Sequence, residues 1–343
     1  VWIVKQTCPN RPYTWVLCIQ MCTMTSPIPI SNITQEWVEV LEKWHLDLFL
    51  IPTIVITLAT LLASPVLLVS IFLSRALRQE TRYLLLANIL VADLFLVLLN
   101  LATLICNALR APMQWLGCEL VTTLTVTSYC CAIYTVTLMV VDTYAAVRWP
   151  LRYRDVIPPS CTYCILVGVW VLAAIYPFTV MIKTQVASGN FHEKLPVCLV
   201  LISLGFIQAR NMTGIYIYFF VAALMCSLLI SYCYIRLYMI TRTQGIWHNR
   251  FSRARVTLLA HGVLLLLYFA PGFLFTIELV LIDRKDIPQD VRVWVSTVNM
   301  CVFMLLPRVF APYLYGIRYR EISDTVMLLL LHQHRRLSQA TAA

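Results

Sequence analysis

One apolar run, YLLLANILVADLFLVLLNLATLICN at residues 83–107, constrains the fold more than any other feature of the sequence. About 20 apolar residues in a helix are enough to span the hydrocarbon core of a bilayer, so this run predicts a transmembrane helix. It contains one carboxylate, Asp93, near its middle. An ionised side chain at that depth costs on the order of several kcal/mol unless it has a partner, and such residues usually serve a function. Asp93 is therefore the first candidate functional residue.

The sequence offers Asp93 one obvious counter-charge, Arg308, in the apolar run MCVFMLLPRVFAPYLYG. Opposite charges in a dry helix bundle must pair, or the acid must be protonated, because water does not solvate them there. We therefore expect the guanidinium of Arg308 to neutralise Asp93 directly. The alternative is that Arg308 extends its long side chain towards the membrane surface or a water-filled cavity.

Six further apolar runs are each long enough to cross a membrane. The seven runs together are residues 47–73, 83–107, 118–147, 162–182, 212–240, 254–282 and 292–316. The chain is 60% hydrophobic and 12% charged, whereas soluble domains are roughly 45–50% apolar, so a soluble fold is excluded. The fold class that we expect is an all-α membrane protein, a seven-transmembrane helix bundle.

The runs divide the chain into three regions. Residues 1–45 form an N-terminal tail, residues 46–317 form the bundle, and residues 318–343 form a cytoplasmic segment. Apolar side chains recur at helical spacing in the last region, which predicts a short amphipathic helix on the membrane surface followed by a tail. Residues 14–24 resemble the apolar part of a signal peptide, but Gln20 interrupts them and no cleavage site is clear, so both interpretations stay open.

Signals in the loops agree on the orientation of the bundle. The loops after odd-numbered runs carry eleven Lys and Arg residues with their flanks, against seven for the loops after even-numbered runs. Because positive charge accumulates on the cytoplasmic side, we expect an extracellular N-terminus at the plasma membrane. Glycosylation sequons at Asn32 and Asn211 then lie outside, and Asn32 is the better candidate because Asn211 abuts the fifth run. Cys118 and Cys198 also lie outside, where disulfides persist.

Short motifs occur in a characteristic order along the runs. The second run contains Asn88-Ile-Leu-Val-Ala-Asp93, and Cys118 in the third is followed twenty-four residues later by Asp142-Thr-Tyr144. The later runs contain Trp170, Tyr232, Phe269-Ala-Pro271 and Ala311-Pro312-Tyr-Leu-Tyr315. On these motifs, residues 46–331 resemble the rhodopsin-like (class A) G-protein-coupled receptors, and three longer stretches are similar to an orphan receptor of that family.

The resemblance implies a receptor without catalytic activity, cofactor or metal, whose partners are an unknown extracellular ligand, a heterotrimeric G protein and membrane lipids. It also implies a disulfide between Cys118 and Cys198. No nucleic-acid partner is expected, because membrane topology accounts for the excess of 26 basic over 16 acidic residues. A carrier or channel is the less favoured alternative, because the chain has no internal repeat and no pair of interrupted half-helices.

The family keeps its ligand pocket in the outer half of the bundle. Counting from the matched motifs, the lining residues would be Thr125, Tyr129, Tyr216, Phe220, Phe269, Thr276 and Cys301. Aminergic receptors carry an Asp where Thr125 stands, so a biogenic amine is not expected, and Leu305 replaces the lysine that binds retinal in opsins. An aromatic, weakly charged pocket suits a lipid, a small peptide or a modified amino acid.

The resemblance also assigns switch and structural roles within the bundle. The residues concerned are Asp93, Arg308, Asp142, Thr143, Tyr144, Tyr232, Pro271, Pro312 and Tyr315. The two prolines remove helix hydrogen bonds and are predicted hinges, with Phe269 a candidate toggle beside one of them.

Several of these motifs depart from the family pattern: Pro65 and Ala311 replace asparagines, Thr143 replaces an arginine, and Phe269 replaces a tryptophan. A threonine has neither the charge nor the reach of arginine, so a signalling-silent or modulatory protein is the main alternative function.

Overall fold

The computed structural model describes residues 46–109, 111–149, 158–188, 194–195, 198, 209–243, 263, 266–274, 291, 295 and 298–318. Several predictions lie outside these residues: the N-terminal tail with Asn32, the suggested signal segment at 14–24, the amphipathic helix after the seventh run, and the pocket residue Thr276. The three proposed regions with boundaries at residues 45 and 317 therefore stay a prediction.

Five helices in the described part of the chain are long and apolar enough to cross a membrane. They are α3 (Leu46–Leu73), α5 (Thr81–Ala108), α6 (Trp115–Arg148), α8 (Pro159–Ser188) and α10 (Ala209–Thr243), with the short α4 (Arg75–Arg78) between the first two. These helices correspond to the first five apolar runs and extend beyond each of them. Helix α10 has 35 residues, so it is about 52 Å long and exceeds the thickness of the hydrocarbon core.

The sixth and seventh runs are described in part. Residues 266–274 are helical in the sixth run. The seventh contains a π-helix, η2 (Asn299–Leu305), that continues directly into α13 (Leu306–Arg318). The π-helix was not predicted, and it ends just before Pro307. Because the ring of a proline clashes with the carbonyl four residues earlier, a wider turn at this place relieves a conflict that a regular α-helix would have.

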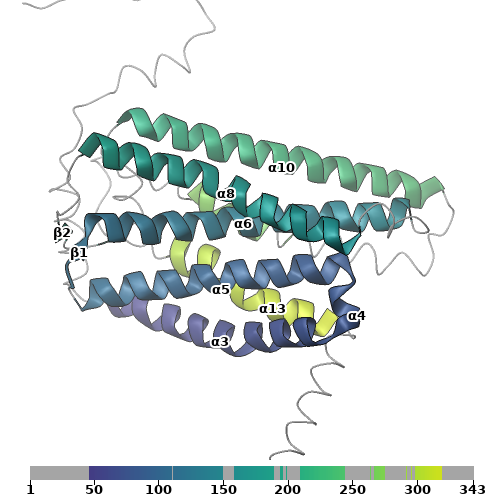
Figure 1. Cartoon of the computed structure of the whole chain (residues 1–343), viewed down its shortest axis with the longest axis horizontal. Coiled ribbons are helices and arrows are strands. Elements are labelled where there is room, and N and C mark those ends of the chain that lie inside the picture. The colour runs from purple at the N-terminus through teal and green to yellow at the C-terminus, as the bar shows by residue number, and fades with distance from the viewer. Residues whose placement is uncertain are drawn as a thin grey trace, which may run out of the picture.

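Helix α6 lies at the centre of the bundle and packs against α5, α8 and α10 (Figure 1). Helix α3 packs against α5 on the other side, and α13 packs against α3 and α5. In Figure 1, α3, α5 and α13 lie together along one side of α6, whereas α8 and α10 lie along the other. Residues from α5, α6 and α13 therefore meet in the interior.

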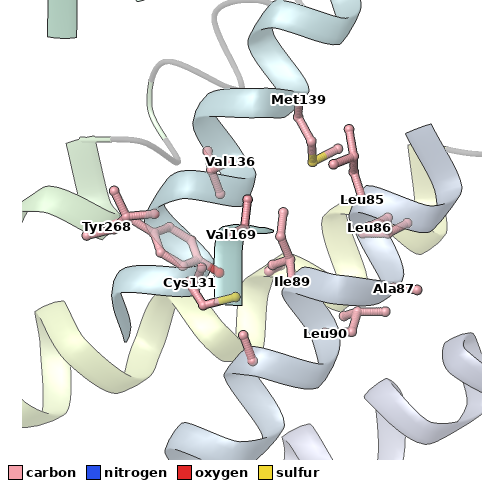
Figure 2. Packing of buried hydrophobic residues seen from close by; sticks show 14 of the residues in the cluster. Leu85, Leu86, Ala87, Ile89, Leu90, Cys131, Val136, Met139, Val169 and Tyr268 are labelled. Carbon is pink, nitrogen blue, oxygen red and sulfur yellow. The ribbon is translucent and has the colours of Figure 1, made fainter. Parts of the chain in front are cut away.

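Buried apolar side chains hold these helices together. Figure 2 shows Leu86, Ile89 and Leu90 of α5 among residues of α6 and α8, with Tyr268 joining them from the sixth run. Leu86 and Leu90 are fully buried, while large apolar side chains such as Leu62 and Met225 are 72% and 62% exposed. An outer surface this apolar suits contact with lipid rather than water.

Hydroxyl groups inside the bundle bond mostly within their own helix. Thr57, Thr60, Ser70, Thr127 and Thr137 each donate to the carbonyl four residues earlier, at 2.6–2.9 Å. In an apolar environment this bond satisfies the hydroxyl without a partner helix. The many threonines of the sequence are therefore compatible with long transmembrane helices despite their weak helix propensity.

One end of the bundle is covalently tied. Cys118 and Cys198 form the predicted disulfide, with a Cα–Cα distance of 5.6 Å. Nearby, β1 (Met113–Gln114) pairs antiparallel with β2 (Lys194–Leu195). Asn107 near the end of α5 adds a further connection, since its amide donates to the carbonyl of Cys198 and accepts from the backbone N–H of Cys198, both at 2.9 Å. Cys198 is thereby attached to both α5 and α6.

Candidate functional site at the centre of the bundle

The buried charges Asp93 and Arg308 lie next to each other. Asp93 comes from α5 and is 1% exposed, and Arg308 comes from α13 and is fully buried. The distance from Arg308 Nε to Asp93 Oδ1 is 3.5 Å. The expected juxtaposition is thus present, and the alternative in which Arg308 extends to the membrane surface does not describe this structure. Whether the pair acts as a switch stays a prediction.

The guanidinium of Arg308 lies between two aromatic rings. Its Cζ atom is 4.6 Å from the ring centre of Tyr268 and 5.6 Å from that of Tyr129. Among the described residues, none accepts a hydrogen bond from its three nitrogens. The charge is therefore stabilised by the carboxylate of Asp93 and by two cation–π contacts. Each cation–π contact is worth about 0.5–2 kcal/mol.

Tyr268 also contacts Asp93. Its hydroxyl donates a hydrogen bond of 2.5 Å to Asp93 Oδ2, on the oxygen that does not face Arg308. A hydrogen bond to an ionised group is stronger than one between neutral groups and favours the charged form of the acid. The sequence analysis did not single out Tyr268. The available signal was its position: it is a polar side chain directly before the motif Phe269-Ala-Pro271 of the sixth run.

Tyr129 of α6 joins the same cluster through the backbone of the sixth run. Its hydroxyl donates to the carbonyl oxygen of Tyr268 at 2.8 Å, and the backbone N–H of Gly272 donates to the Tyr129 hydroxyl at 3.1 Å. A Cβ atom on Gly272 would lie 3.3 Å from that hydroxyl oxygen, which is closer than ordinary contact. The absence of a side chain at Gly272 therefore lets the hydroxyl approach the helix backbone.

Asn88 connects three helices, and it lies five residues before Asp93 on the side of the cytoplasmic end predicted for α5. Its amide nitrogen donates to the hydroxyl of Thr135 on α6 at 2.9 Å, and its carbonyl accepts from the indole N–H of Trp170 on α8 at 2.9 Å. Asn88 and Trp170 belong to the motifs that carried the family resemblance. The structure brings them into direct contact, so part of the motif pattern is explained by a polar link across the bundle.

Two of the residues with predicted switch roles, Tyr144 and Tyr232, are in contact. The ring of Tyr144 packs edge-on against Tyr232 of α10, with ring centres 6.2 Å apart, and against Trp149 at 6.4 Å. Asp142 is buried, and the hydroxyl of Thr143 donates to the carbonyl of Met139 at 2.8 Å. The hydroxyl that replaces the family's arginine is therefore engaged within its own helix. The side chain of Tyr315 lies outside the described part, and Pro312 is buried within α13.

The predicted pocket residues fall into different environments. Thr125 and Tyr129 are 3% and 7% exposed, and the hydroxyl of Thr125 donates to the carbonyl of Val121 in its own helix. Phe269 is partly buried against the core, whereas Phe220 on α10 is 69% exposed. The side chains of Tyr216 and Cys301 are outside the described part of the structure. The pocket as a whole stays a prediction.

Sequence reasoning also missed polar links between neighbouring helices. The amide of Gln185 on α8 donates to the carboxylate of Glu119 on α6, and both side chains are buried. Closer to the middle, the hydroxyls of Tyr134 on α6 and Tyr218 on α10 lie 3.0 Å apart. Each such pair joins residues more than 60 positions apart in sequence, so no local pattern marks them.

Comparisons with known proteins agree with this architecture. Residues 63–315 match the family described as 7 transmembrane receptor (rhodopsin family). Probable G-protein coupled receptor 148 from Homo sapiens is 30% identical over 324 residues, which cover 93% of each chain. Dopamine receptor 4 from Caenorhabditis elegans is 24% identical over 204 residues, which cover 57% of this chain and 39% of that receptor. The chain therefore belongs to the rhodopsin family of seven-transmembrane receptors.

Proposed function

We propose that this protein is a plasma-membrane receptor that transmits the binding of an extracellular ligand to heterotrimeric G proteins. The observation that carries the proposal is the match to the rhodopsin family over residues 63–315, together with a motif set that meets in the interior of the bundle. A bundle of this kind changes state when a ligand favours one packing of the helices over another. No catalytic role is proposed.

The tied end of the bundle supports an extracellular N-terminus. The disulfide between Cys118 and Cys198 would persist outside the cell and would be reduced in the cytosol. Helix α3 begins at that end of the bundle, beside β1 and β2, and ends beside α4 (Figure 1). The start of α3 therefore lies on the same side as the disulfide, which is also the extracellular side favoured by the distribution of Lys and Arg.

The pair Asp93–Arg308 is proposed to take the place of a bound cation. In this family, the acid of the second span usually lies beside a sodium ion, and here a guanidinium is 3.5 Å from that acid. A protein-borne cation cannot dissociate, so the acid would be neutralised in every state of the receptor. Sodium should then leave the melting temperature of the purified wild type unchanged relative to an equal concentration of choline chloride. A sodium-specific stabilisation would contradict this proposal.

Coupling to a G protein is tested best at Thr143, because it replaces the family's arginine. The experiment expresses the wild type, Thr143→Arg and Thr143→Ala at matched surface levels and measures ligand-independent dissociation of each G-protein class in cells. Activation of at least one class by the wild type supports the proposal. The Ala variant controls for loss of the local hydroxyl bond to Met139.

A signalling-silent, modulatory protein is the second candidate, and the engaged hydroxyl of Thr143 is the observation that favours it. If this candidate is right, the wild type activates no G-protein class even when an unbiased screen of lipids, peptides and modified amino acids is applied. Gain of signalling only in Thr143→Arg would then locate the defect at the cytoplasmic switch rather than in the bundle.

A further inference from the structure

Two free cysteines lie on the outer surface of α8. Among the seven free cysteines in the described part of the chain, Cys161 and Cys164 are exposed, and the other five are buried or half-buried. The two are three residues apart in one helix, so their side chains project from the same face, about one turn apart. Cysteine is among the residue types most often buried, so an exposed pair on one face is unusual.

This pair lies at the end of the bundle opposite the disulfide. Thr162, between the two cysteines, is buried, and its hydroxyl lies 3.0 Å from that of Thr81, the first residue of α5. The other end of α5 holds Asn107, which bonds to Cys198 at the tied end. The length of α5 therefore separates the two exposed cysteines from the disulfide (Figure 1). In the proposed orientation, their end of the bundle faces the cytosol.

The position of the pair along α8 matches the boundary between water and lipid. The part of α8 that is apolar enough to span a membrane begins at Ser160, so both thiols lie within its first five residues. Two large amphipathic side chains at the same end, Tyr163 and Trp149, are exposed. Such side chains gather at the headgroup level of a bilayer. A reagent from the cytosol and the hydrocarbon core are therefore both within reach of the thiols.

The exposed face of α8 continues from the cysteines as an apolar surface. Ile165, Leu172 and Ile175 are 37%, 53% and 57% exposed, and their helical spacing places them on the face of Cys164. Gly168 lies among them, and a Cβ atom added there would meet no atom within 4 Å. At 1.5 Å per residue this surface runs roughly 16 Å into the membrane from Cys164. A fatty acyl chain on either thiol would meet only apolar groups along it.

We propose that Cys161 and Cys164 are sites of S-acylation by a long-chain fatty acid, whose chain inserts into the cytoplasmic leaflet along α8. The thiol sulfur attacks the carbonyl carbon of a fatty acyl-coenzyme A, and the bond from that carbon to the sulfur of coenzyme A breaks. The thiol proton passes to the departing sulfur, so the products are a cysteine thioester and free coenzyme A, without oxidation or reduction. Cysteines beside a membrane accept acyl groups reversibly in this way. The proposal rests on the proposed orientation and not on signalling.

The test counts thioesters on the full chain expressed in cells. Disulfides are reduced, free thiols are blocked with N-ethylmaleimide, and hydroxylamine then cleaves thioesters, so that a polyethylene-glycol maleimide adds one mass step at each freed thiol. The wild type should show two hydroxylamine-dependent steps, Cys161→Ser and Cys164→Ser one each, and the double variant none. In cells fed alkyne-tagged palmitic acid, the wild type should carry the tag and the double variant should not.

Cys106→Ser is the matched control, because Cys106 is also a free cysteine of a spanning helix but lies half-buried near the tied end. It should keep the wild-type pattern. Serine is close to cysteine in size, and both tested positions are exposed, so the surface level of each variant should equal that of the wild type. Mass spectrometry of the wild-type peptide that contains both cysteines should show the added acyl group, which makes the test independent of how the variants fold.

A wild type without hydroxylamine-dependent steps, or a double variant that keeps the wild-type pattern, would overturn the acylation site. Neither measurement needs a ligand or a G protein. When an N-terminal tag is accessible on intact cells, the absence of thioesters refutes the acylation site alone and leaves the receptor function standing. A tag that is reached only after permeabilisation refutes the orientation, and with it the cytosolic position of both thiols.

Discussion

At the scale of single residues, Arg308 has the most unusual environment in the described part of the protein. A guanidinium that is fully buried and lacks hydrogen-bond acceptors among the described residues is expensive to desolvate. The carboxylate of Asp93 and the rings of Tyr129 and Tyr268 offset part of that cost. The arrangement therefore depends on all of these side chains being present together.

Removing one charge of the pair should destabilise the protein strongly. Arg308→Met leaves Asp93 buried without its counter-charge, and breaking a buried pair in this way costs about 3–5 kcal/mol. We expect a lower melting temperature and lower surface expression. The exchange of Asp93→Arg with Arg308→Asp should restore part of the expression lost in either single variant. Equal loss in the exchanged and single variants would show that charge pairing is not what stabilises this site.

At the scale of helices and loops, the tied end combines a covalent link with a pair of hydrogen bonds. The disulfide attaches Cys198 to α6, and Asn107 attaches the backbone of the same residue to α5. Two helices thus hold one residue of the loop before α10. The sequence made the cysteine pair visible, but nothing in it marked Asn107 as the second attachment.

Replacing Asn107 by alanine should loosen this loop without breaking the disulfide. The change removes two hydrogen bonds, each worth roughly 0.5–1.5 kcal/mol net, so a small fall in melting temperature is expected. Asn100→Ala serves as the control, because the side-chain amide of Asn100 donates to the carbonyl of Leu96 within α5 itself. Hydrogen exchange of the peptide containing Cys198 should increase in Asn107→Ala and not in the control.

The π-helix before Pro307 is another feature at this scale. The hydrophobic run at 292–316 predicts a spanning helix, and Pro312 predicts a kink within it. Periodicity alone does not distinguish an α-turn from a π-turn over seven residues. The wider turn ends at Leu305, three residues before Arg308, so it changes the register with which the seventh run presents its charged residue to the bundle.

At the scale of the whole molecule, the protein has buried hydroxyls and charges inside and large apolar side chains outside. Ser70 and Thr135 are fully buried, whereas Leu62 and Val167 are 72% and 64% exposed. Unlike a soluble domain, the protein exposes many large apolar side chains on its outer surface, because that surface faces lipid and not water. In lipid the apolar surface has no reason to be hidden, and polar groups must find partners inside.

The proposed orientation predicts a glycan on the N-terminal tail. Asn32 begins an Asn-Ile-Thr sequon, and in this orientation it faces the lumen during synthesis. Treatment with an N-glycosidase should increase the electrophoretic mobility of the wild type expressed in cells, and Asn32→Gln should already have the higher mobility. Antibody access to an N-terminal tag on intact cells provides an independent check. A tag that is reached only after permeabilisation would reverse the orientation.

Much of this protein follows from the sequence because a membrane simplifies the problem. Apolar length alone located the five spanning helices that the structure describes. The presence of one carboxylate, Asp93, in the second run and one guanidinium, Arg308, in the seventh was enough to predict that the two side chains lie together. These inferences need no tertiary information, since an uncompensated charge or an unpaired backbone group is too costly in lipid.

The tertiary structure alone decided what surrounds the charges. Tyr129 was predicted to line a ligand pocket, yet its hydroxyl bonds to the backbone of the sixth run, and Tyr268 was not singled out although it bonds to Asp93. The contact between Tyr129 and Tyr268 joins residues 139 positions apart, and the contact between Tyr268 and Asp93 joins residues 175 positions apart. They depend on the rotation and separation of packed helices, which side-chain volumes set jointly and no single run of sequence contains.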